Sequence, residues 1–238
     1  MNKEDLTPTQ AHAEESHSLP STTTESRLFP AWHLIPGILI LTAGVIATFY
    51  WSMRTDPPYF MGMKDTWRYY GPILSFMDHA IHEDGELPFW NPLYFCGQPH
   101  AANPQSFVFY PPNLLRSLLT FHPTPLKTQI GAGLLVLAEI LFTGIGVLLL
   151  ARRHRYSSAA ALVSAFAYAF SSALMARAVC HWIFLNCACW LPWTMLALYY
   201  AVHAQKTATR IAAAALAGLS FGCCILGGVP VLIFLCGL

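Results

Sequence analysis

The chain has 238 residues, with 13 Lys and Arg against 12 Asp and Glu, and therefore a formal net charge of +1. Charged residues make up 11% of the chain, against roughly 25% in a typical soluble domain, whereas apolar residues reach 55%. This composition excludes a disordered protein, a nucleic-acid binder and an ordinary cytosolic enzyme. It points to a protein in contact with lipid.

Residues 1–33 are rich in Ser, Thr, Pro and Glu, carry five acids against two bases, and show no hydrophobic periodicity. They are typical of a disordered tail. No basic stretch is followed by a short apolar core and a cleavage site, so a signal peptide is not indicated.

Residues 34–53 contain no charged side chain, and 20 helical residues at about 1.5 Å each cover the roughly 30 Å hydrocarbon core of a bilayer. Four further apolar runs predict membrane-spanning helices at 129–151, 157–176, 182–202 and 211–238. The sequence therefore predicts an all-α integral membrane protein with about five transmembrane helices.

Basic residues in the short loops set the expected orientation. Arg152, Arg153 and Arg155 follow the second run, while Lys206 and Arg210 follow the fourth, which predicts that both loops are cytoplasmic. The amino terminus is then cytoplasmic, and the long loop 54–128 lies outside. Because the chain stops inside an apolar run after an odd number of spans, we expect it to be an amino-terminal fragment of a longer protein.

The outer loop begins with a predicted amphipathic helix over 65–83, where apolar residues recur at three-four spacing and Gly85 follows as a terminator. We expect this helix to lie in the membrane interface with its apolar side towards lipid. The next stretch is rich in Pro and in aromatic residues. It predicts an ordered cap with a second short helix from Pro112 to Leu119.

Several short motifs occur in this loop: KDTWR at 64–68, GELPFWNP at 85–92, GQP at 97–99, ANPQS at 102–106 and FYPPNLL at 109–115. Together they resemble the first external loop of the bacterial YfhO-like membrane proteins, which are similar to the polytopic GT-C glycosyltransferases. A later stretch, AVCHW at 178–182 through Asn186 and WLPW at 190–193, resembles the region between the third and fourth spans of that family. The resemblance covers roughly positions 30 to 235.

The resemblance implies a GT-C-like fold in a bacterial cytoplasmic membrane. It also implies a polyprenyl-phosphate sugar donor and an envelope glycan or protein as acceptor. In GT-C enzymes an acidic residue soon after the first span deprotonates the acceptor or binds a metal. Asp65, twelve residues after Met53, matches that placement.

Transfer of a sugar from a lipid phosphate requires a carboxylate as general base and positive charge near the departing phosphate. Asp65 is the first candidate for the base and Glu86 the second. The candidates for the positive charge are Lys64, Arg68, Arg177 and His181.

Each of these residues has a structural alternative. Asp65 can cap the helix that follows it. Lys64 and Arg68 can bind lipid headgroups, and His181, beside Trp182, can be an interface residue.

Amide side chains pair well with sugar hydroxyls, and a tryptophan offers a flat face to a sugar ring. The residues expected to face a sugar are Trp90, Asn91, Gln98, Asn103 and Gln105. The alternative for the amides is turn formation, because Asn before Pro favours turns.

A divalent metal is compatible with the acids and histidines of the first loop helix, whose three-four spacing suits metal ligation as well as a solvated face. These residues are Asp78, His79, His82, Glu83, Asp84 and Glu86. The sequence assigns no definite metal ligand and no cofactor.

Glu139 lies in the middle of the second predicted span, where an ionised carboxylate is costly. It is either a hydrogen-bonded packing residue or part of a proton or substrate path. Two functions therefore stay open. One is a glycosyltransferase with Asp65 as its base, and the other is a non-catalytic transport or assembly protein for envelope glycan or lipid.

Overall fold

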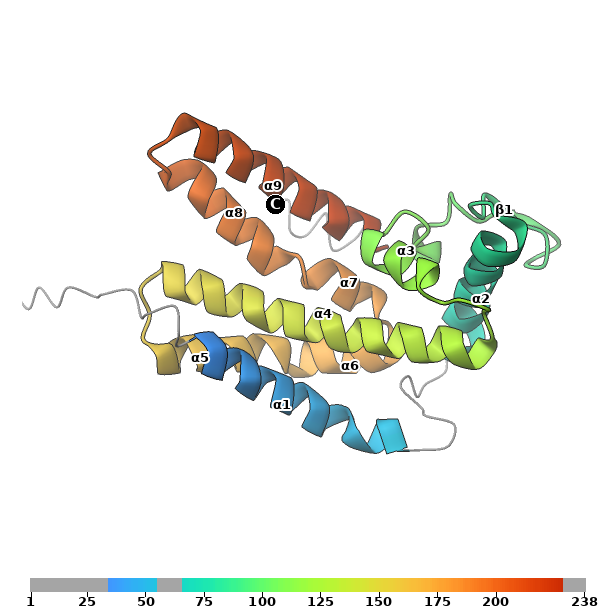
Figure 1. Ribbon diagram of the computed structural model, residues 1–238, viewed down its shortest axis with the longest axis horizontal. Helices are drawn as coiled ribbons and strands as arrows, with labels where there is room; N and C mark the ends of the chain where they lie inside the picture. The colour runs from blue at the N-terminus through green and yellow to red at the C-terminus, as the bar shows by residue number, and fades with distance from the viewer. Residues whose placement is uncertain (1–33, 55–65, 229–238) are drawn as a thin grey trace, which may run out of the picture.

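The computed structural model describes residues 34–54 and 66–228, which are mostly helical. Long helices form a bundle, and a group of short helices with one small hairpin lies at one end of it (Figure 1). The bundle consists of α1 (Leu34–Arg54), α4 (Pro125–Arg153), α5 (Ser158–Ala169), α6 (Ser172–Cys180), α7 (Ile183–Ala188), α8 (Leu191–His203) and α9 (Thr207–Leu226). The short group, here called the cap, comprises residues 66–121.

Three helical segments are long and apolar enough to cross a bilayer: α4, the stretch Ile183–His203 that joins α7 to α8, and α9. Helices α5 and α6 make a fourth candidate if they count as one span, bent by 44°. By the length and composition of these helices, the chain is a multi-pass membrane protein. At 29 residues, α4 is about 43 Å long, which matches a bilayer with its headgroup regions.

The predicted spans agree with the helices to different degrees. The second predicted span lies within α4, which begins earlier because Thr124 caps it by accepting a hydrogen bond from the Lys127 amide. The third, 157–176, is divided, since Ser171 interrupts it and caps α6. Helix α1 carries a shorter apolar stretch, Leu34–Tyr50. The predicted tail 1–33 and the end of the predicted fifth span lie outside the described residues.

Helix α4 is the centre of the bundle and packs against α1, α5, α7 and α8, while α8 pairs with α9. Two of its glycines permit this close approach. A Cβ on Gly144 would lie 3.0 Å from Leu41 of α1, and one on Gly146 would lie 2.7 Å from the indole nitrogen of Trp193 in α8. Small residues at such crossings are the usual way for membrane helices to pack closely.

The cap begins with a nearly continuous helical stretch made of η2 (Thr66–Tyr70), α2 (Gly71–His79) and η3 (Ala80–Asp84). It matches the predicted helix over 65–83 and ends at Gly85, which adopts the left-handed φ of 70°. Its expected orientation is wrong, however. Ile73, Leu74 and Met77 are buried inside the protein instead of facing lipid, because α2 packs against α3 and α4.

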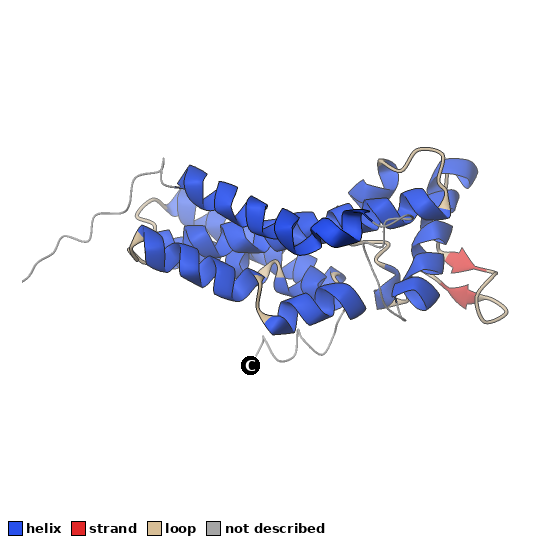
Figure 2. Ribbon diagram, turned by 90° about the horizontal axis from the view of Figure 1, so that it is seen from below, coloured by secondary structure: helices blue, strands red, loops and turns tan. Residues whose placement is uncertain are grey.

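The rest of the cap contains a two-stranded antiparallel ladder, β1 (Trp90–Asn91) with β2 (Gln98–Pro99), the 3₁₀ turn η4 (Pro104–Ser106) and helix α3 (Pro111–Leu118). The ladder lies at the outer tip of the cap (Figure 2). It is the only departure from an all-α fold among the described residues. Helix α3 begins at the Pro pair, close to the predicted start.

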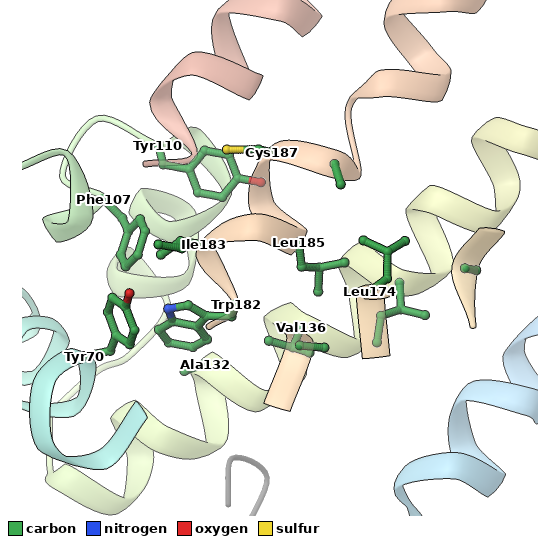
Figure 3. Close-up of a cluster of buried hydrophobic side chains, with 14 of the residues drawn as sticks. Tyr70, Phe107, Tyr110, Ala132, Val136, Leu174, Trp182, Ile183, Leu185 and Cys187 are labelled. Carbon is green, nitrogen blue, oxygen red and sulfur yellow. The ribbon is translucent and has the colours of Figure 1, made fainter. Parts of the chain in front are cut away.

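An aromatic core joins the cap to the bundle. The ring of Trp182, just before α7, lies 5.7 Å from Tyr70 and 6.0 Å from Phe107, measured between centroids. Tyr110 and Ile183 belong to the same cluster, which continues to Leu185 and Val136 (Figure 3). The cap is therefore a packed part of the fold and not a separate loop.

A buried ion pair connects three helices at the base of the cap. Arg116 of α3 donates two hydrogen bonds to the carboxylate of Asp78 in α2, at 2.8 and 2.7 Å. Ser117 and Thr128 donate to the same carboxylate at 2.6 and 2.7 Å, and Arg116 also donates to Asn113 at 2.8 Å. Four donors compensate the cost of burying the Asp78 carboxylate away from water. This cluster therefore holds α2, α3 and the start of α4 together.

We expect Asp78→Asn to destabilise the protein by about 3 to 5 kcal/mol, because it leaves the buried Arg116 guanidinium without its counter-charge. Thermal unfolding of the purified protein in detergent measures the effect. Asp84→Asn is the matched control, since Asp84 is exposed at the end of the same helical stretch. Equal unfolding temperatures for the two variants would contradict the assigned role of the pair.

Candidate functional site

A buried polar cluster lies where the cap meets the bundle. Its centre is Glu139 of α4, which is only 4% exposed. The Tyr110 hydroxyl donates to Glu139 Oε1 at 2.6 Å, and the Trp190 indole donates to the Tyr110 hydroxyl at 3.0 Å. In the amide orientation that satisfies its neighbours, Asn186 donates to Glu139 Oε2 at 2.9 Å and to the Trp182 carbonyl at 3.1 Å.

The residues around Glu139 come from three separate elements. Tyr110 directly precedes α3, Asn186 lies in the short helix α7, and Trp190 directly precedes α8. Burial raises the pKa of Tyr110 well above its usual value, so the phenol keeps its proton and remains a donor. Within residues 34–54 and 66–228, no basic side chain forms an ion pair with Glu139.

A cavity of about 240 Å³ adjoins the cluster. Its walls are largely apolar, and its polar atoms come from the cluster itself. The lining residues are Tyr110, Pro112, Leu135, Ala138, Glu139, Phe142, Cys189 and Trp190. The cavity therefore suits an apolar ligand, with the hydrogen-bonded pair of Tyr110 and Glu139 at one side.

The cationic candidates from the sequence lie in different surroundings. Lys64, like the proposed base Asp65, is outside the described residues. Arg68 is exposed on η2. Arg177 is exposed at the end of α6 with its guanidinium 4.5 Å from the Phe184 ring, and the ring of His181 lies 6.4 Å from the same phenylalanine.

The second candidate base, Glu86, is exposed immediately after Gly85. Its backbone amide donates to the Ala80 carbonyl at 3.0 Å, which closes the end of η3. The structure therefore brings Arg177 and His181 together around Phe184 and gives Glu86 a solvent-facing position.

Two of the four amides are occupied by the loop's own structure. Asn91 is buried and accepts a hydrogen bond from the Leu93 amide at 2.9 Å. Asn103 accepts from the Gln105 amide at 3.0 Å and donates to the Tyr69 hydroxyl at 3.1 Å. Both residues thus have the turn-forming contacts that the sequence offered as the alternative.

The other candidates for sugar contact are less constrained. Gln98 and Gln105 are half-buried, and the side-chain nitrogen of Gln98 is buried without a hydrogen-bond partner among the described residues. Trp90 is 58% exposed. Because successive side chains of a strand alternate, the ladder places Trp90 on the face opposite Asn91 and its partner Gln98.

The acids and histidines of the first cap helix do not converge on a metal site. Asp78 is bound by Arg116, His79 contacts the Ser75 carbonyl at 2.7 Å, and His82 contacts the Ser117 carbonyl at 2.8 Å. Over the described part of the chain, no group of three or more His, Cys, Asp or Glu side chains could hold a metal ion.

The sequence pointed to Glu139 but not to its partners. A carboxylate in a long apolar run signals that donors must be near, yet Tyr110 is 29 residues earlier and Asn186 is 47 residues later. Tyr110 and Trp190 occurred only as members of motifs. Their aromatic rings with one polar atom each are the signal that could have selected them.

Comparison with known proteins gives no assignment. The chain matches no protein-family model, no curated protein and no solved structure.

We expect Tyr110→Phe to lower the free energy of unfolding by about 1 to 3 kcal/mol, because the substitution leaves Oε1 of a buried carboxyl without its donor. Denaturation in detergent measures the loss. Tyr156→Phe is the matched control, since Tyr156 is exposed. If Glu139→Met, which removes the acceptor, suppresses most of the Tyr110→Phe effect, the loss acts through Glu139, and additive losses would contradict the assigned contact.

His100 predicts a pH dependence of stability. The residue is fully buried in the cap, neither ring nitrogen has a hydrogen-bond partner among the described residues, and its ring lies 5.1 Å from Phe76. Burial lowers the pKa of His100 to about 4. The unfolded chain binds the proton near pH 6.5, so between these values the unfolded state holds more protons than the folded state.

The free energy of unfolding should therefore fall as the pH decreases from about 7 to 4, by up to about 3 kcal/mol from His100. Thermal unfolding at a series of pH values, with and without His100→Asn, measures this contribution. His122→Asn, at an exposed position, serves as the control. An equally steep pH dependence in the His100 variant would refute the assignment.

Proposed function

We propose that this chain belongs to a glycosyltransferase of the GT-C type in a bacterial cytoplasmic membrane. In this proposal it transfers a sugar from a polyprenyl-phosphate donor to an envelope glycan or protein outside the membrane. The chain has about five spans, its amino terminus is cytoplasmic, and Asp65 acts as the general base. The resemblance of the cap motifs to the YfhO-like proteins motivates the proposal.

The structural observation that supports it best is the fixed attachment of the cap to the bundle. Two buried polar contacts and one aromatic core hold the cap against the bundle: Thr128 to Asp78, Tyr110 to Glu139, and Tyr70 with Phe107 against Trp182. A fixed cap at the helix ends can hold a lipid-borne sugar and exclude water from the reaction.

The aromatic core also brings two candidate segments near each other. His181 directly precedes Trp182, whose ring lies 5.7 Å from Tyr70, and Tyr70 comes five residues after Asp65. His181 therefore lies beside the segment that follows Asp65 in the sequence. Direct displacement of a phosphate needs a base and a positive charge on opposite sides of the sugar.

In the proposed reaction, Asp65 accepts the proton of the acceptor hydroxyl while the new glycosidic bond forms and the bond to the donor phosphate breaks. Arg177 and His181 stabilise the negative charge of the departing phosphate. Asp65 also precedes the helix in the sequence as an N-cap would, and one carboxylate can have both roles.

A second function is favoured by a different observation. Asn91 and Asn103 make turn contacts, and Glu139 lies in a cavity within the bundle. These features suit a non-catalytic protein that binds envelope glycan or lipid during transport or assembly, with Glu139 on the pathway.

The deciding experiment uses the protein in lipid vesicles with radiolabelled polyprenyl-phosphate hexoses and a cell-envelope extract. We expect Asp65→Asn to lower the transfer rate by about 100-fold or more, as for loss of a general base. Asp84→Asn is the control and should retain the rate. Unfolding temperatures confirm that both variants fold.

Each result assigns the function differently. Transfer that survives in the folded Asp65→Asn variant would exclude Asp65 as the base and make Glu86→Gln the next variant. Absence of transfer by the wild type from any donor would exclude the enzyme and favour the transport or assembly protein.

A further inference from the structure

A second and larger cavity runs along α4, between this helix and α3. Its volume is about 580 Å³, and its walls are mostly aliphatic. Leu115 of α3 and Leu119, directly after this helix, form one side, and Ile130 and Leu134 of α4 form the other. Leu115, Leu119 and Leu134 are each more than half exposed, so the groove opens on an apolar flank of the protein.

The length of this groove matches one leaflet of a bilayer. Along α4 it extends from Lys127 to Ala138, which is about 16 Å at the helical rise. The hydrocarbon core of a bilayer is roughly 30 Å thick, so one leaflet is about half of that. A single acyl chain fits this depth, whereas a polyprenyl chain is longer than one leaflet.

Lys127 lies at the mouth of the groove. Its ammonium group donates to the carbonyls of Phe121 and His122 at 3.1 and 3.0 Å. An ammonium has three N–H donors. Among the described residues, only these two carbonyls accept a hydrogen bond from Lys127. The two carbonyls fix the charge at one position, where the third donor can bind a phosphate oxygen.

The depth of Lys127 suits a phospholipid headgroup. Helix α4 is about 43 Å long, which equals the hydrocarbon core plus both headgroup regions. Lys127 is near one end, and Arg152 and Arg153 are at the other. With the basic residues of α4 at the two headgroup levels, the groove lies within the leaflet on the side of Lys127.

The floor of the groove is fixed by the buried ion pair. At Gly131, a Cβ would lie 3.4 Å from Arg116 Cγ and 3.5 Å from Thr120 Oγ1. Because Arg116 is bound to Asp78, α3 cannot shift towards α4 to close the groove without disturbing that pair. The groove is therefore a preformed feature, as ligand sites usually are.

We propose that the groove between α3 and α4 binds one acyl chain of an anionic phospholipid, with the phosphate held by Lys127. The aliphatic walls, the length of one leaflet and the fixed cation at the mouth together match this lipid. The proposal does not depend on the glycosyltransferase function.

The test uses the purified full chain in detergent and native mass spectrometry during titration with phosphatidylglycerol. We expect Lys127→Gln to weaken binding of this lipid about tenfold, as for loss of a charge-assisted hydrogen bond. Lys206→Gln is the matched control, because Lys206 is also exposed but lies at the start of α9. Equal weakening by the two variants, or none by Lys127→Gln, would overturn the headgroup assignment.

A second variant tests the chain site independently. Leu134→Trp fills the groove and should weaken phosphatidylglycerol binding at least tenfold, whereas Leu198→Trp, at an exposed apolar position in α8, should not. A phosphatidylglycerol with a diazirine near the end of its acyl chain should label peptides of α3 and the middle of α4. Labelling spread evenly over the other apolar helices would overturn the site.

Competition identifies the class of lipid. Polyprenyl phosphate should displace phosphatidylglycerol from the wild type only at higher concentration, because its chain exceeds the groove. Displacement at lower concentration would overturn the phospholipid assignment. Unfolding temperatures for all four variants confirm that changes in binding do not arise from unfolding.

Discussion

The buried pair between Asp78 and Arg116 is the contact on which the cap depends. It joins α2 to α3, and through Thr128 it joins both to the start of α4. An isolated charge in such surroundings costs several kcal/mol, so neither partner can leave the other without a large penalty. The positions of three helices are therefore coupled, although few of their residues are near in sequence.

The contact between Tyr110 and Glu139 is a second connection of a different kind. A neutral phenol meets a single carboxyl, and no described basic residue pairs with that carboxyl. Because backbone and side-chain polar groups in an apolar region must find partners within the protein, Glu139 requires the donors that Tyr110 and Asn186 supply. The cap thus reaches the middle of α4 and does not only cover its end.

The sequence predicted the helices well where the length of an apolar run or the spacing of apolar residues is enough to identify a helix. Long apolar runs located α4 and α9, and three-four spacing located the helical stretch that ends at Gly85. The partner of an apolar face could not be predicted, since periodicity shows that a face is apolar but not whether it meets lipid or protein. That is why α2 was expected at the membrane surface and is instead buried against α3 and α4.

The same limit applies to the candidate sites. Glu139 was recognisable because one carboxyl in an apolar run is unusual, whereas its donors come from distant segments. For Asn91 and Asn103 the sequence allowed two roles, sugar binding and turn formation, because an amide side chain can do either. Their hydrogen bonds within the loop show which groups hold its shape. The two cavities could not be predicted, since they arise from the placement of α3 against α4.

Placement of α3 also connects the two cavities to each other. Pro112, Leu135 and Ala138 line both the groove and the cavity beside Glu139. Pro112 follows Tyr110 by two residues, and Tyr110 belongs to the aromatic core of the cap as well as to the polar cluster. A chain that enters the groove therefore contacts the turn of α3 that sets the position of Tyr110. Through this tyrosine, the groove that opens on the apolar flank and the packing of the cap against Trp182 share one element, the start of α3.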